Sequence, residues 1–120
     1  MRRRPEAFLW DIREAAARIR EFVGDLDLAG FSRSTLVQAA VERQFEIIGE
    51  ALNQLSRIAP KTIEQIPDSA RIIAFRNILI HGYAVLDHRI VWSVIEKHLP
   101  ELEMAVQALL DSGPVKFEDS

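Results

Sequence analysis

Apolar residues recur along this chain at intervals of three and four positions, the spacing that marks one face of an α-helix. The first stripe predicts a helix over residues 5–24, with proline in its first turn and glycine at its end. Residues 25–30 are expected to form a turn. A second stripe predicts the longest helix, which is capped by Ser32 or Ser34 and ends near Ile58.

The pattern continues in the second half of the chain. Pro60 and Pro67 bracket a connector with room for one short helical turn, and a third helix is predicted from Asp68 or Ser69 to Gly82. Glycine accepts the left-handed conformation that often follows a helix, so the helix is expected to end there.

A fourth helix is predicted after a cap at Asp87. Pro100 falls inside it and predicts either a kink or two consecutive helices. Alternating strand patterns and hairpin turns are almost missing. The sequence therefore predicts an all-α fold, an antiparallel bundle of four to five helices in one domain over residues 1–110, with a flexible tail over residues 111–120.

Composition narrows the class of protein. The chain has 120 residues, of which 48% are hydrophobic and 28% charged, as in a folded soluble domain. Without cysteine it has neither disulfides nor thiolate metal sites, and it has no apolar run long enough to cross a membrane. The N-terminus lacks the pattern of a secretory signal. We expect a cytoplasmic protein with no membrane partner.

The net charge of −3 argues against a protein that coats nucleic acid, because such proteins are usually basic. It leaves room for an enzyme that holds a few nucleotides in a local basic cleft. It also suits a protein that stays bound to a protein partner.

The segment 76–83 gathers chemistry that suits RNA cleavage: Arg76, Asn77, His81 and Tyr83. Arginine can grip a phosphate at two points, and histidine exchanges protons near neutral pH. Residues four apart lie on one helix face, so Asn77 can orient the imidazole. Arg76 and His81 are five apart, roughly 140° around the axis, so their side chains point in different directions.

One chain supplies only part of a catalytic set. Cleavage without a metal needs one group to take the 2′-hydroxyl proton, another to protonate the leaving oxygen, and a cation near the phosphoryl oxygens. A two-fold homodimer would bring a second Arg76 and His81 to a shared cleft. A metal site is not expected, because His81, His88 and His98 do not share a helix face with a carboxylate at ligand spacing.

A structural interpretation stands beside the catalytic one. Arginine and histidine near a helix end also neutralise its dipole, and Tyr83 can simply pack there with its hydroxyl in water. Glu46 and Glu50, one turn apart on the second helix, either support Arg76 by ion pairing or form a solvated flank. We expect at least one of them to lie on the flank.

The motif also resembles the signature of the HEPN superfamily, in the branch of small HepT-like toxins encoded beside minimal nucleotidyltransferase (MNT-type) antitoxins. Arg76, Asn77, His81 and Tyr83 match that signature, residues 45–51 look like the second-helix signature, and the likeness covers residues 11–110. Two positions depart from the usual pattern: Asp68 stands where members commonly have tryptophan, and Phe75 where they often have methionine.

The resemblance implies a homodimeric helical bundle, the toxin of a type VII-like toxin–antitoxin system. The protein would be a metal-independent endoribonuclease that acts on RNA. It would need no cofactor, and DNA is not expected as a substrate. Arg76 would stabilise the phosphate, His81 would act in acid–base catalysis and Asn77 would orient. Adenylylation of Tyr83 by the nucleotidyltransferase antitoxin would neutralise the toxin. The alternatives are a catalytically silent helical partner that docks a nucleotidyltransferase, or a purely structural dimerising bundle.

Overall fold

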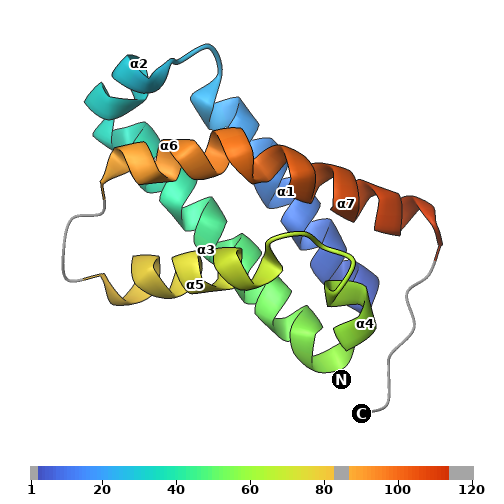
Figure 1. Ribbon diagram of the computed structural model, residues 1–120. Helices are drawn as coiled ribbons and strands as arrows, with labels where there is room; N and C mark the ends of the chain where they lie inside the picture. The colour runs from blue at the N-terminus through green and yellow to red at the C-terminus, as the bar shows by residue number, and fades with distance from the viewer. Residues whose placement is uncertain (1–2, 83–86, 114–120) are drawn as a thin grey trace.

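The computed structural model describes residues 3–82 and 87–113, and these form helices and short connectors without a strand (Figure 1). The helices are α1 (Pro5–Val23), α2 (Leu28–Arg33), α3 (Thr35–Ile58), α4 (Pro60–Ile63), α5 (Ser69–His81), α6 (His88–Lys97) and α7 (Leu99–Asp111). The predicted all-α bundle is confirmed. Five of these helices are long, and α2 and α4 are short additions to them.

The antiparallel pair α1 and α3 forms the centre of the molecule (Figure 1). Leu9, Ile12 and Ile19 of α1 are fully buried against this partner, as are Phe45 and Leu52 of α3. Burying such side chains contributes roughly 1.5–3 kcal/mol each. This central pair is therefore the platform on which the other helices are placed.

Helix α5 packs on α3, whereas α7 packs on α1. The ring of Phe75 meets that of Phe45 edge to face, with 5.4 Å between centroids and 83° between planes, and this fixes α5 on α3. Helices α6 and α7 follow one another in a nearly continuous line across the central pair (Figure 1). Helix α6 reaches the rest of the bundle mainly through α2 and α7.

The prediction of a plain turn over residues 25–30 is wrong at its end, because α2 begins at Leu28. The side chain of Asp27 accepts a hydrogen bond from the Gly30 amide at 2.8 Å and starts this helix. Phe31 then anchors it, being fully buried with its ring 5.3 Å from that of Trp92 on α6. The cap and one buried aromatic ring stabilise α2. Its six residues are too few to show a helical period in the sequence.

The caps settle the alternatives at the other helix ends. Ser34, not Ser32, caps α3 by accepting a hydrogen bond from the Val37 amide at 3.2 Å. Asp87 caps α6 as predicted, and its hydrogen bonds with the Arg89 side chain and backbone lower its pKa. Pro100 produces two consecutive helices rather than a kink, because it stands in the first turn of α7, where no amide hydrogen is needed.

The start of α5 is tied to the junction of α6 and α7. Asp68 precedes the helix in a left-handed conformation, with φ of 59°, and its side chain makes no capping hydrogen bond. Instead its Oδ2 lies 2.8 Å from Nδ1 of His98, the residue between α6 and α7. The helix that carries the motif is therefore held by α3 along its length and by His98 at its beginning.

Helix α7 extends to Asp111, and residues 114–120 of the expected tail lie outside the described residues. In the described part of the chain, each helix is too short or too polar to span a lipid bilayer.

Candidate functional site

Helix α5 is apolar on more than the side that it buries. Ile72 and Phe75 are buried against α3. Ile78 and Ile80 are 54% and 46% exposed. A helix with apolar residues on both sides is typical of one that is sandwiched between partners. In the described residues only α3 packs closely on α5, and Ile78 and Ile80, about 200° apart around the axis, lie on two different flanks of the motif-bearing helix.

Gly49 allows α3 and α5 to approach each other at the level of Arg76. A Cβ atom built on Gly49 would lie 2.2 Å from Cβ and 2.6 Å from Cγ of Arg76, far closer than atoms can pack. Glycine inside a helix is intrinsically unfavourable by about 1 kcal/mol relative to alanine, so a packing reason is expected. Here the reason is the passage of the Arg76 side chain directly over the helix backbone.

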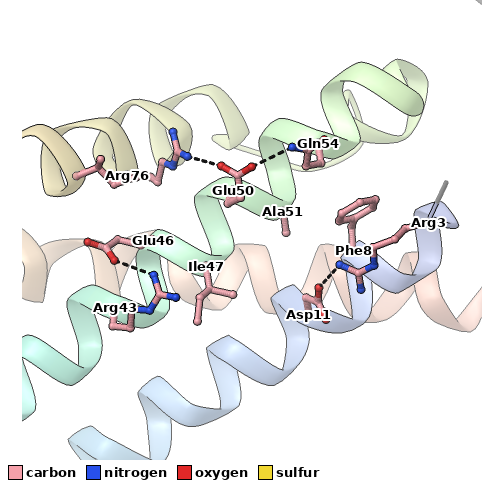
Figure 2. A pocket seen from close by; sticks show the side chains of 11 residues that line it. Arg3, Phe8, Asp11, Arg43, Glu46, Ile47, Glu50, Ala51, Gln54 and Arg76 are labelled. Carbon is pink, nitrogen blue, oxygen red and sulfur yellow. Dashed lines mark hydrogen bonds and ion pairs between the residues drawn. The ribbon is translucent and has the colours of Figure 1, made fainter. Parts of the chain in front are cut away.

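The Arg76 side chain, 21% exposed, is held by its neighbours on two helices. Nη2 forms an ion pair with the carboxylate of Glu50, and Nη1 donates to Oδ1 of Asn77 at 2.7 Å. Glu50 in turn accepts a hydrogen bond from Nε2 of Gln54 at 2.9 Å (Figure 2). Nε of Arg76 is buried and has no hydrogen-bond partner in the described part of the chain. The guanidinium is thus preorganised by Glu50 and Asn77 at the edge of the helix pair.

Glu46 and Glu50 of α3 have different positions. Glu50 supports Arg76, whereas Glu46, one turn earlier, lies 3.2 Å from Nη1 of Arg43, whose side chain is 68% exposed. The Glu46 side chain is 25% exposed and lines the pocket beside Arg76, so it does not form a solvated flank. The alternative of support by ion pairing fits Glu50.

His81 is the last residue of α5, and its side chain is exposed. Within residues 3–82 and 87–113, no hydrogen bond joins it to Arg76 or to Asn77. The side-chain oxygen of Asn77 accepts a hydrogen bond from the neighbouring guanidinium, a charged donor. Arg76, Asn77 and Glu50 come together and His81 stands apart. Tyr83 lies outside the described residues.

A pocket of about 320 Å³ opens beside Arg76 between α1, α3 and α5 (Figure 2). Three arginines line it, and each is paired with a carboxylate that also lines it: Arg3 with Asp11, Arg43 with Glu46, and Arg76 with Glu50. Arg3 also stacks over the Phe8 ring, with its Cζ 4.6 Å from the ring centroid. The site is therefore a cluster of guanidinium groups whose charge is balanced within the chain.

Sequence reasoning missed Gly49, Arg3 and Arg43 as members of this region. Gly49 did carry a signal, because an isolated glycine inside a strong helical pattern usually marks a close contact. Arg43 carried none, and Arg3 belongs to the basic run 2–4, for which the sequence favours a solvated terminus over an RNA contact.

The described side chains include no cluster of three His, Asp or Glu residues able to hold a metal ion. The groups present offer a fixed cation and an exposed imidazole on one helix. Such groups can stabilise negative charge on a phosphate and transfer protons.

Comparisons with known proteins identify a family and several relatives of this chain. A protein-family model described as "Ribonuclease HepT-like" matches residues 12–109. A protein of Methanocaldococcus jannaschii named "Putative RNase" is 32% identical over 102 residues, 85% of this chain and 93% of the relative. The "Probable ribonuclease HepT" of Thermococcus cleftensis is 33% identical over 105 residues, 86% of this chain and 93% of the relative. No solved structure shows significant similarity to the chain.

Proposed function

Because the chain belongs to the ribonuclease HepT-like family, we propose that it is an endoribonuclease whose RNA-cutting site is built from Arg76 and His81. The observation that carries this assignment is the Arg76 guanidinium, which α3 holds in place beside an open pocket. An arginine that only neutralised the helix dipole would not need the support of Glu50 and Gln54.

In the proposed reaction, a 2′-hydroxyl of the RNA attacks the adjacent phosphorus and the 5′-oxygen of the next nucleotide leaves. His81 acts in proton transfer, either from the attacking hydroxyl or to the leaving oxygen. Arg76 offsets the charge that develops on the phosphoryl oxygens. Asn77 and Glu50 position the guanidinium and do not themselves touch the substrate.

The set of catalytic groups becomes complete in a homodimer. One chain has one imidazole at this site, whereas the reaction requires two proton transfers. The Ile78 flank of α5 continues into a groove of about 470 Å³ toward α6, lined by Phe75, Ile78, Ile90 and Val94 among others. Ile78 and Ile90 are 54% and 50% exposed, which is typical of a surface covered by a partner. A second copy on this surface would bring a second His81 to the cleft.

The toxin role and its control belong to the same proposal. Free ribonuclease activity would stop growth, and a minimal nucleotidyltransferase would suppress it by adenylylating Tyr83. In that step the tyrosine oxygen attacks the α-phosphorus of ATP and pyrophosphate leaves. A phosphodiester beside His81, two residues away, would then put bulk and negative charge where the RNA phosphate must bind.

Cleavage is expected to persist without divalent metal ions, because arginine and histidine supply all the catalytic groups of this proposal. Purified protein should cut a fluorescent single-stranded RNA at the same rate, within about twofold, with and without excess chelator. A metal-dependent nuclease in the same buffer should lose its activity, which controls for metal removal. Absence of cleavage in both buffers would favour the silent partner of a nucleotidyltransferase.

Modification by the antitoxin is expected at a single residue. Incubation with ATP and a minimal nucleotidyltransferase should add the mass of one AMP to the wild-type protein and stop RNA cleavage. Tyr83→Phe should gain no mass and should stay active. An equal gain in both proteins would place the modification elsewhere.

A further inference from the structure

We propose that the pocket between α1, α3 and α5 is a nucleotide subsite for the RNA substrate, in which Arg43 and Arg3 bind the phosphate next to the scissile one. This inference rests on the proposed ribonuclease function and extends it from the cleaved bond to the neighbouring nucleotide. It concerns residues that lie outside the motif.

The first support is the convergence of arginines from three parts of the chain. Arg3 precedes α1, Arg43 belongs to α3 and Arg76 to α5, and all three line one pocket (Figure 2). The net charge of the chain is −3 and three carboxylates line the same pocket, so the arginines balance these acidic groups until a ligand displaces them. Guanidinium groups are the side chains best matched to phosphate oxygens.

The second support is the unequal strength with which these arginines are held. The Arg43 and Arg3 side chains are 68% and 51% exposed, and those of their partners Glu46 and Asp11 are 25% and 37% exposed. Ion pairs at a protein surface are typically worth about 0–1 kcal/mol. Arg76 is 21% exposed and contacts Glu50 and Asn77. A phosphate can therefore draw Arg43 and Arg3 from their carboxylates at little cost, while Arg76 stays in place.

The third support is the size and lining of the pocket. At about 320 Å³ it lies at the small end of ligand sites, which span about 300–1,000 Å³, and it suits one nucleotide rather than a duplex. Its wall includes the ring of Phe8 and the apolar side chains of Ile47, Ala51 and Ile80. Bases of single-stranded RNA stack on aromatic rings and on arginine planes, and the Arg3–Phe8 stack provides both.

The test measures KM, kcat and binding for Arg43→Gln, Arg3→Gln and the double variant on a single-stranded RNA. The matched control is Arg57→Gln, which removes the same charge from an exposed position of α3 outside this pocket. We expect the double variant to raise KM about tenfold or more with kcat within about twofold, and the control to match the wild type. Arg43→Lys should recover only part of the loss, because lysine lacks the planar fork.

Salt dependence separates a phosphate contact from a structural effect. RNA binding is measured in a His81→Ala background to prevent cleavage, and each lost phosphate contact should flatten the log–log salt slope by about 0.7. If the wild-type protein cleaves RNA and the double variant has the same KM and salt slope, the subsite is overturned and the proposed function stands. A wild-type protein that cuts no RNA would overturn both.

Discussion

Replacing His81 with alanine is expected to slow RNA cleavage by about 10²–10⁴-fold, the usual contribution of a general acid or base. The imidazole is exposed at the end of α5, so the thermal unfolding midpoint should not change. Arg76→Ala should slow cleavage by about 10²–10³-fold, the range found when one group that stabilises transition-state charge is removed. Initial rates on a defined RNA, measured beside the unfolding midpoint, separate a catalytic effect from misfolding.

The same two variants test whether the site is shared between chains. Homodimers of His81→Ala lack both imidazoles, and homodimers of Arg76→Ala lack both guanidinium groups. A mixed dimer keeps one of each, so an equimolar mixture of the unfolded variants, refolded together, should be more active than either variant alone. A mixture that contains mixed dimers but shows no gain would argue for self-contained sites.

Gly49→Ala should destabilise the protein by about 1–3 kcal/mol, the usual cost of forcing an extra methyl group into a packed contact. Alanine gains about 1 kcal/mol of helix propensity over glycine, but the new methyl would lie 2.2 Å from Cβ of Arg76, which cannot rotate away. The helices must therefore separate, and Arg76 must move with α5. The free energy of unfolding in urea and the cleavage rate should fall together.

Gly30→Ala is the control for that change. A Cβ at Gly30 would meet Cδ2 of Leu26 at 2.8 Å, and this atom is the movable end of a flexible side chain. We expect little loss of stability and no loss of cleavage. An equal effect of the two substitutions would show that the contact between α3 and Arg76 has no special role.

The fold could be predicted from the sequence to the extent that its helices show a period. The long helices, the cap at Asp87 and the break at Pro100 follow from local patterns. Helix α2 could not be predicted, because its six residues depend on the long-range contact between Phe31 and Trp92. Local sequence patterns therefore predict the long helices and their ends, whereas α2 depends on a contact between distant segments.

The candidate site likewise has a part that the sequence predicts and a part that depends on how the helices pack. Helix geometry alone indicates that Arg76 and His81 point apart. It does not reveal that Glu50, 26 residues earlier, meets Arg76, or that Asn77 accepts a hydrogen bond from the guanidinium. The pocket that Arg3 and Arg43 share with Arg76 depends on how α1, α3 and α5 pack, and no spacing in the sequence reports it.

The close contact at Gly49 also bears on how such chains diverge. The nearest atom to a side chain at that position is Cβ of residue 76, which every amino acid except glycine possesses. A descendant that lost Arg76 would still need Gly49 to keep its helices at the same distance. We therefore expect a glycine here in any relative that keeps this distance between the helices, whereas the arginine is needed only where the proposed chemistry is kept. Of the two positions, residue 76 is the one expected to differ between an active relative and a silent one.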